Sequence, residues 1–342
     1  MSITPPVTED LRVEQLAAEA SAPWWRRAIK PLLLSAVLLV WAGNVLGEDH
    51  AAIGVDAAAV ICTVCGLHLL IQWSGQVSLG HMAIVGIGGF ATANFAVEQE
   101  LPLPLALLLG GFSATLATVA IGLPALRIRG FALAITTLAA ATAVSAYLFR
   151  QDWLAGGSLG ILIPETNFFG WDSQEPTDFI VPALIVALIV MFITTKIGQS
   201  GVGNALRMVA NDDEVAASYG INVGTHRLAA FLFSGFVAGI GGGLMVLDLG
   251  RASPEMFPPT ESIVFVAAVL MGGAGSIRGS VIAAVALVAV PALLDIGHYE
   301  ELVGSLALLL AVRFAPGGIN GQHEHTMERI ASLKAKRQGE SK

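Results

Sequence analysis

Three polar residues lie at the start of a long apolar run, where their side chains could contact a polar solute. They are Gln76, Ser78 and His81, within the segment Gly75-Gln76-Val77-Ser78-Leu79-Gly80-His81. Polar groups at such depth usually face a bundle interior or a water-filled path, because burying them unsatisfied costs free energy. On a helix, Ser78 and His81 would share one face and could line a translocation path. Alternatively, Gln76 caps the helix and His81 hydrogen-bonds a neighbouring backbone carbonyl.

The other ionisable residues in or near apolar runs are Asp56, His68 and Asp248. Asp56 and Asp248 lie close to the ends of their runs, where water is within reach. A proton-coupled carrier would place carboxylates in the middle of such runs, and the sequence has none there. His68 and His81 lie on different runs with no carboxylate nearby. The pattern therefore favours neither an ion-coupled carrier nor an intramembrane enzyme.

Two short motifs resemble known sites but lack the necessary context. Cys62 and Cys65 form a C-x-x-C inside an apolar run, without a second ligand pair for zinc or a water-accessible setting for redox chemistry. The glycine-rich segment 272–279 resembles a nucleotide-binding loop, but no Gly-Lys-Ser/Thr ends it and no βαβ pattern surrounds it. We therefore expect small buried cysteines, a glycine turn and no cofactor. Any ATP hydrolysis must come from another chain.

The composition is that of a membrane protein. Of 342 residues, 55% are hydrophobic and 13% charged, 38 are glycine, and the mean hydropathy is +0.72. Such a chain has too few polar side chains to cover a soluble globule. The net charge of −8 argues against a nucleic-acid partner, which would require a basic face. The mixed charge of residues 1–27 does not predict a removable signal peptide.

Apolar runs long enough to cross the hydrocarbon core recur along the chain. They predict an all-α polytopic membrane protein with about ten transmembrane helices. The glycines and alanines within them, such as Gly89 and Ala93, should allow close helix contact. The predicted spans are 31–47, 52–72, 76–97, 103–126, 131–149, 179–195, 228–248, 262–274, 279–296 and 301–315.

The distribution of Lys and Arg orients this topology. Inner loops collect positive residues, and an inside N-terminus leaves only Arg150 and Arg251 outside among the 18 Lys and Arg residues. The prediction is therefore that both termini are cytoplasmic. The predicted organisation comprises an N-terminal extension (1–30), a transmembrane domain (31–316) that includes a long outer loop (150–178), and a polar tail (317–342).

The cytoplasmic loop 196–227, here called the coupling segment, is polar but carries helix signals. Asn211 or Asp212 can cap a new helix, acidic residues fill its first turn, and Gly220 is suited to end it in a left-handed cap. A helix of about two turns is unstable in water unless it packs against something. We expect that partner to be another protein. The acidic outer loop, with its aromatic residues at headgroup depth, could anchor the protein at the interface or receive a soluble partner.

Five blocks in order along the chain resemble the LivM-type permease subunits of bacterial ABC importers for branched-chain amino acids. They are 75–81 with the following glycines, 123–130, 156–161, 204–223 and 272–279, covering most of the chain from Gly75 to Pro316. The family glycine motifs fall on Gly75, Gly80, Gly156, Gly157, Gly272, Gly273 and Gly275.

The resemblance implies an inner-membrane transport subunit without catalysis of its own. ATP and Mg would be bound by two partner ATPases, a second related permease would complete the membrane part, and a soluble binding protein would deliver substrate. The coupling helix that docks on the ATPase would match Glu214, Ala216, Ala217 and Gly220, with Val215 inserted and Asp212 and Asp213 completing a charged turn. Relatives of the family carry urea, short amides and other small solutes, so these remain alternative substrates.

Overall fold

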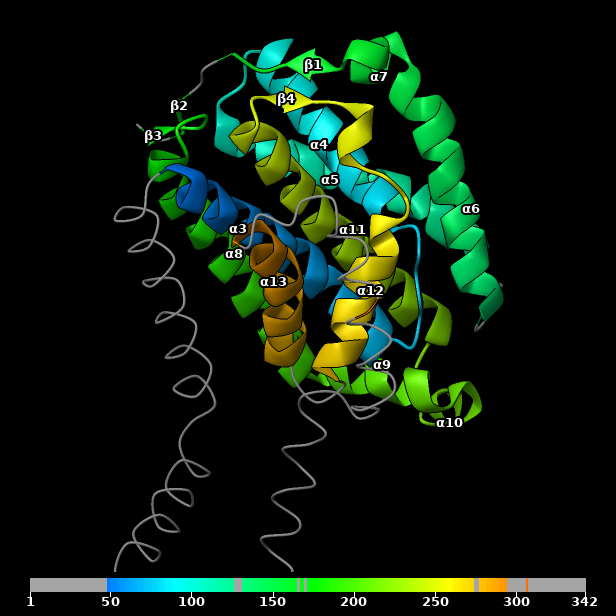
Figure 1. The fold of residues 1–342 in the computed structure, drawn as a ribbon. Helices are drawn as coiled ribbons and strands as arrows, with labels where there is room; N and C mark the ends of the chain where they lie inside the picture. The colour runs from blue at the N-terminus through cyan, green and yellow to red at the C-terminus, as the bar shows by residue number, and fades with distance from the viewer. Residues whose placement is uncertain are drawn as a thin grey trace, which may run out of the picture.

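The computed structural model describes residues 48–125, 131–164, 167–168, 171–273, 277–293 and 306. Within these residues the chain is helical apart from two small two-stranded pairings (Figure 1). The predicted spans 31–47 and 301–315, except Leu306, lie outside the described residues, as do the predicted N-terminal extension and polar tail.

The elements follow one another along the chain as membrane helices joined by short connecting pieces. The helices that form the bundle are α3 (Glu48–His68), α4 (His81–Val97), α5 (Leu103–Ala125), α6 (Phe131–Tyr147), α8 (Pro176–Gln199), α11 (Val223–Asp248), α12 (Glu261–Gly272) and α13 (Ile277–Leu293). The connecting pieces are the π-helix η1 (Leu69–Trp73), η2 (Leu148–Arg150), α7 (Asp152–Ala155), η3 (Gly157–Leu159), β1 (Ile161–Leu162), β2 (Asn167–Phe168), β3 (Trp171–Asp172), α9 (Gly201–Asn211), α10 (Asp213–Ser218), β4 (Arg251–Ala252) and η4 (Pro254–Met256).

Eight of the predicted spans have an apolar helix in the structure. Six segments are long and apolar enough to cross a membrane: Ala51–Trp73, Leu103–Ala120, Ala132–Arg150, Pro176–Gln199, Val223–Asp248 and Pro254–Gly272. Two shorter apolar helices, His81–Val97 and Ile277–Ala289, correspond to predicted spans as well. The prediction of an all-helical polytopic membrane protein is confirmed at this level.

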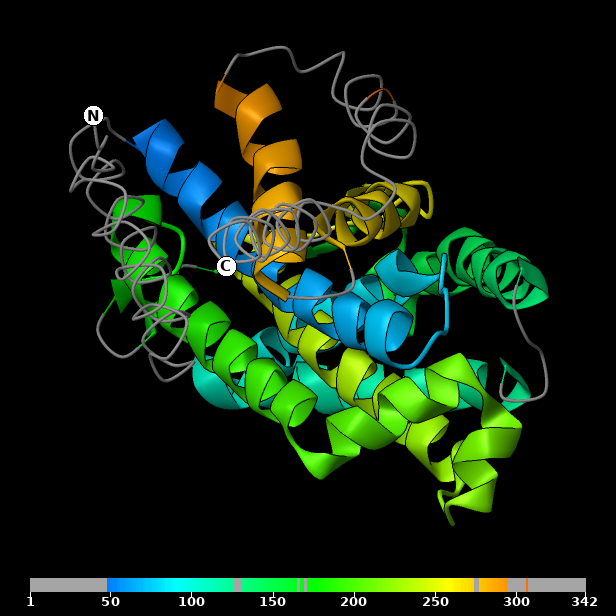
Figure 2. The same cartoon turned by 90° about the horizontal axis from the view of Figure 1, so that it is seen from below.

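Helix α11 runs through the middle of the bundle and packs against α3, α4 and α5 (Figures 1 and 2). Its close contacts depend on glycine. A Cβ at Gly242 would lie 2.0 Å from the carbonyl oxygen of Val85, and one at Gly88 would lie 2.2 Å from the Cα of Gly239. Small residues let helix backbones approach closely where the apolar solvent gives no hydrophobic drive for association. The expectation that the glycines of span three admit neighbouring backbones is therefore confirmed.

Helix α6 lies at the edge of this bundle (Figures 1 and 2). Only 28% of its span is buried, compared with 89% for the span that contains α3. Its exposed side chains include Ile135 and Tyr147. This outward face is therefore available for contact with lipid or with another membrane helix.

The loop after α6 is built on three left-handed glycines. Gly156, Gly157 and Gly160 have φ values of 64°, 73° and 80°, which side-chain-bearing residues rarely adopt. The chain then forms β1, which pairs antiparallel with β4. At Gly160 any Cβ would lie 2.2 Å from the carbonyl oxygen of Ala252. The predicted glycine motif thus brings this loop onto the segment that follows α11.

A second glycine turn joins α12 to α13. Gly273 has a φ of 77°, and a Cβ at Gly272 would lie 2.1 Å from the backbone nitrogen of Ser280. The two helix ends therefore meet backbone to backbone. The third glycine predicted for this motif, Gly275, lies outside the described residues.

The contact between Gly88 and α11 gives a stability prediction. Gly88→Leu should lower the free energy of unfolding by at least about 1–3 kcal/mol, because the added side chain would overlap the backbone of α11. Thermal unfolding of the purified protein in detergent would measure the change.

Gly201→Leu is the matched control, because no atom lies within 4 Å of a Cβ at that position. Equal melting temperatures for the two variants would contradict the packing assigned to Gly88.

Candidate functional site

The coupling segment forms two helices at one end of the bundle. Ser200 caps α9, and Asp212 caps α10 by accepting hydrogen bonds from the amides of Glu214 at 2.8 Å and Val215 at 3.1 Å. Of the two predicted caps, Asp212 is therefore the one used. Gly220 has a φ of 79°, which confirms the predicted left-handed end. Short helix α10 is thus held by caps at both ends.

Amphipathic packing fixes α9 to the bundle. Its buried residues Leu206 and Val209 face inward, while its other face is largely exposed. Leu206 belongs to a small apolar cluster contributed by η1, α6, α9 and α11: Leu69, Leu70, Trp73, Leu133, Leu206, Ala230 and Phe231. This cluster supplies the support that a short helix needs.

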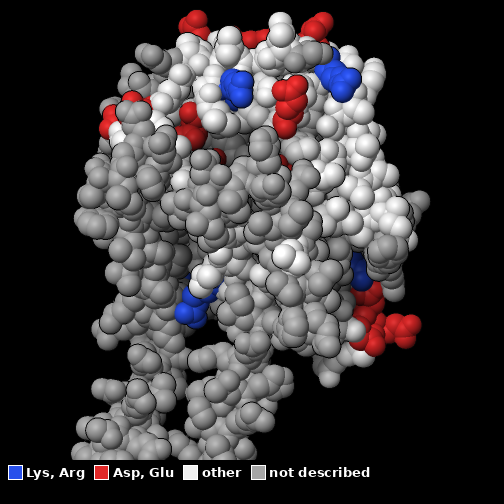
Figure 3. Space-filling model, viewed as in Figure 1, with Lys and Arg blue, Asp and Glu red and all other residues white. Residues whose placement is uncertain are grey.

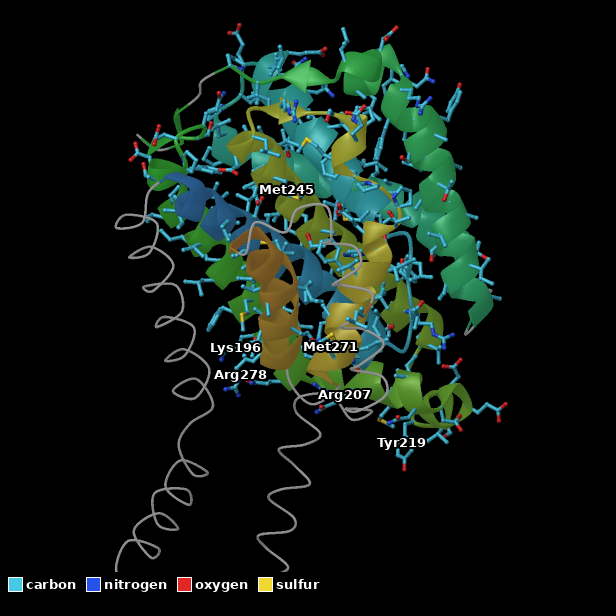
Figure 4. The ribbon with its side chains drawn as sticks, in the orientation of Figure 1. Lys196, Arg207, Tyr219, Met245, Met271 and Arg278 are labelled. Atoms are coloured by element: carbon cyan, nitrogen blue, oxygen red, sulfur yellow. The ribbon has the colours of Figure 1, made fainter. Side chains whose placement is uncertain are left out.

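Helix α10 projects from the bundle and presents an exposed surface, here called the tip. The tip consists of Glu214, Val215, Ala217, Ser218 and Tyr219. Val215 is 49% exposed and Tyr219 75% exposed, and Tyr219 points away from the bundle in Figure 4. Apolar side chains exposed together beside charged ones are typical of a protein-binding surface.

Ala216 does not belong to the tip, although the coupling-helix pattern includes it. Its side chain is completely buried by the rest of the chain. Ala217, by contrast, is exposed. The two small residues therefore differ: Ala216 lets α10 lie close to its own support, whereas Ala217 lies on the exposed face of the helix.

The three acidic residues of the predicted charged turn, Asp212, Asp213 and Glu214, also have different environments. The carboxylate of Asp213 makes an ion pair with Arg227 at 2.9 Å, and both side chains are mostly buried, with 13% and 15% exposed. This pair fastens α10 to the start of α11. Asp212 is occupied in capping, so Glu214 is the acidic residue of this turn that faces outward from the tip. Acidic side chains gather at this corner of the molecule in Figure 3.

The polar residues predicted to line a path are buried, but not on one helix. Gln76, Ser78 and His81 are 4%, 1% and 0% exposed. Helix α4 begins only at His81, so the expected shared helical face of Ser78 and His81 is wrong. The reason lies upstream, where the π-helix ends and Gly75 turns the chain with a φ of 69°.

Of the two structural alternatives proposed at these positions, the helix cap is not observed. The Gln76 amide nitrogen donates to the Oγ of Ser74 instead of capping α4. The His81 ring lies beside the backbone of Thr63 in α3, although among the described residues neither ring nitrogen has a well-formed hydrogen bond. This buried histidine remains a candidate for the path, and its role there stays a prediction.

The loop from Ser74 to Gly80 is a junction between the coupling segment and the bundle. A Cβ at Gly75 would lie 3.2 Å from the Cα of Ala210 in α9. The amide of Leu79 donates to the Oγ1 of Thr137 in α6 at 3.0 Å. The loop therefore touches both the coupling segment and the peripheral helix, and Gly75 and Gly80 permit these approaches.

Sequence reasoning missed Trp73 and Arg207. The Arg207 guanidinium lies 5.1 Å from the centre of the Trp73 ring, a cation–π contact between α9 and η1. The sequence places Trp73 directly after an apolar run and Arg207 in the amphipathic helix of the coupling segment. Only the fold shows that they meet.

The chain is similar to known transport permeases. A family model described as "Branched-chain amino acid transport system / permease component" matches residues 51–313. The LivM permease of Escherichia coli (strain K12) is 29% identical over 279 residues, which cover 74% of this chain and 66% of that protein, slightly under two thirds of it.

Two further relatives are a LivM and a LivH permease of Salmonella typhimurium. The LivM protein is 28% identical over 84% of this chain and 74% of its own length. The LivH protein is 29% identical over 52% of this chain and 55% of its own length. Since the family model spans most of the chain, including α3 to α13, this protein belongs to the family of permease components of branched-chain amino acid transport systems.

Proposed function

We propose that this chain is one membrane-spanning permease subunit of an ATP-driven importer for branched-chain amino acids. Its partners would be two ABC ATPases, a second related permease and a soluble substrate-binding protein. The observation that carries the proposal is the tip of α10, an exposed patch on a helix that is capped, ion-paired and packed onto the bundle. A surface held this firmly can transmit force from a docked partner.

The work of transport would then be divided between chains. Permease components of this family carry no cofactor and are not catalytic, and ATP is bound by the partner ATPase. Closure of the ATPase dimer would displace the tip, and the bundle would tilt from an inward-open to an outward-open state. An almost complete shift between two such states requires several kcal/mol of preference from the partner.

Charge supports a cytoplasmic position for the coupling segment. Lys196, Arg207 and Arg278 lie at the end of the bundle that carries α10 (Figure 4). Arg150 follows α6 and Arg251 follows α11, so Arg251 lies at the end of α11 that is remote from α10. By the positive-inside rule, α10 would lie inside, loop 150–178 outside and both termini in the cytoplasm.

The outer loops would receive the binding protein. Their pairing through β1 and β4 joins two loops distant in sequence into one surface. This surface exposes Trp153, Leu159 and Leu162 at 69%, 95% and 78%. Apolar side chains exposed in a loop supported by neighbouring strands suit transient docking.

Substrate identity rests on family membership and not on a specific pocket. Gln76, Ser78 and His81 would line the path, and a path without tight side-chain recognition suits branched-chain amino acids. Urea, short amides and other small solutes are the alternatives. An ion-coupled carrier is a less favoured reading, since it would run without an ATPase.

The proposed function is tested by reconstitution in liposomes with the ATPases, second permease and binding protein encoded beside this chain. We expect leucine uptake that requires ATP and the binding protein. Competition by isoleucine, valine, urea and acetamide would identify the substrate class. Uptake that an ion gradient drives without ATP would contradict the proposal.

Glu214→Arg tests the tip. It should weaken ATPase binding at least about tenfold, because it reverses a charge at the centre of the proposed contact. Co-purification and titration of the ATPase against the permease would measure the loss.

Glu255→Arg is the matched control for Glu214→Arg. Glu255 is also acidic and exposed on a short helix, but it lies at the opposite end of α11. It should bind the ATPase normally and insert into the membrane as well as the unmodified chain. Equal affinities for both variants would refute the role given to Glu214.

Cysteine labelling tests the orientation. The two native cysteines, Cys62 and Cys65, are completely buried and should give little background. Ser218→Cys should react with an impermeant maleimide only from the cytoplasmic side, and Leu159→Cys only from the outside. The reverse pattern would place the coupling segment outside and end the proposal.

A further inference from the structure

Trp73 joins the coupling segment to the membrane bundle. The ring is buried, with 4% of the residue exposed, and its face carries the Arg207 guanidinium of α9. Its edge lies against the end of α8, where a Cβ at Gly198 would come within 2.1 Å of the ring atom Cη2. The end of α8 and helix α9 therefore both contact the side chain of Trp73.

The π-helix η1 places His68 next to Trp73. Backbone bonds in a π-helix run between residues five apart, so residues at this spacing come to lie over one another. In an α-helix the facing neighbours are three and four apart. The ring centres of His68 and Trp73 are 5.2 Å apart, with an interplanar angle of 89°. The irregular turn thus creates an aromatic contact that a regular helix would not.

His68 continues the contact to α12 and α13. Its Nδ1 lies 2.8 Å from the Oγ of Ser280, and that hydroxyl lies 3.2 Å from the carbonyl oxygen of Val269. With the single hydroxyl proton of Ser280 assigned to Val269, the Nδ1 of His68 is the donor in the first bond. The amide of Gln72 also donates to Val269, at 3.1 Å.

The carbonyl of Val269 belongs to the last turn of α12, which ends at Gly272. The last four carbonyls of a helix have no partner within the helix. In an apolar environment an unsatisfied carbonyl is strongly unfavourable. Side chains from η1 and α13 satisfy this one. The end of α12 is therefore held by the same stretch of chain that contacts the coupling segment.

We propose that Arg207, Trp73, His68 and Ser280 form a relay that passes movement of the coupling segment to the adjoining ends of α12 and α13. The inference rests on the proposed function, which supplies the movement, and it adds the residues that convey it. Arg207 and Met271, the latter near the end of α12, lie at the same end of the bundle in Figure 4. His68 and Ser280 act here as positioning residues, since they move other elements and need not touch substrate.

The test uses the reconstituted importer and two readouts, ATP hydrolysis and leucine uptake. His68→Leu removes the hydrogen bond from one side, and Ser280→Ala removes it from the other. Each should leave ATPase binding intact and lower the uptake per ATP hydrolysed about fivefold, the effect of losing one such bond. The double variant should lose no more than either single variant, because both break the same link.

Two further variants separate a relay from a merely structural role. His68→Asn places an amide near the position of Nδ1 and should restore uptake per ATP. Trp73→Phe should retain most coupling, whereas Trp73→Leu, which removes the ring face, should reduce it. Ser113→Ala is the matched control, since in the described structure that hydroxyl donates to the carbonyl of Leu109 within its own helix, at 2.9 Å. The uptake per ATP hydrolysed should not change in this variant.

Each outcome bears on one proposal or the other. If His68→Leu and Ser280→Ala lower hydrolysis and uptake in equal proportion, the residues are structural and the relay is wrong. If the ratio stays at the unmodified value, the relay is wrong as well. If the unmodified complex shows no ATP-dependent uptake, the proposed function itself fails, and the relay fails with it.

Discussion

The structure depends on the close approach of α11 to α3, α4 and α5. Within a bilayer the helices gain nothing from leaving water, so association depends on dispersion contacts between well-fitted surfaces. Glycines at the contact, such as Gly88, Gly239 and Gly242, bring backbones together with no side chain between them. A bundle packed in this way deforms little and moves as a body. Displacement at one end can therefore reach the other.

That rigidity makes the attachment of the coupling segment important. The ion pair of Asp213 with Arg227 and the burial of Leu206 and Ala216 fix α9 and α10 to the bundle. The residues of the tip remain exposed. Anchoring and the proposed docking thus fall on different faces of α10, so a partner could bind without loosening the attachment of this helix.

Sequence patterns predicted the features that follow from local chemistry. Long apolar runs gave the helices, Asp212 and Gly220 gave the ends of α10, and the paired glycines gave the turns at Gly156 and Gly273. Each of these depends on a residue and its immediate neighbours. The start of α4 was predicted five residues early, because no residue near Gln76 reports that the preceding helix ends in a π-turn.

The contacts between distant segments could not be predicted in the same way. Ala216 and Ala217 are adjacent and chemically identical, yet one is buried and the other exposed. Asp213 and Glu214 differ in the same manner, since only the fold brings Arg227 to the first of them. The family pattern identifies such positions as a group, and the packing beneath α10 distinguishes them.

The contacts that join the coupling segment to α12 are individually weak, which would suit the proposed alternation of the subunit between two states. A cation–π contact and a neutral hydrogen bond each contribute on the order of 1 kcal/mol. Links of this size could break and re-form within the several kcal/mol that the proposed ATPase partner would supply. The glycine-lined contacts of α11 have no such freedom, because their backbones already touch. The bundle can therefore keep its core while the weaker contacts around Trp73 and His68 rearrange at the end that carries the coupling segment.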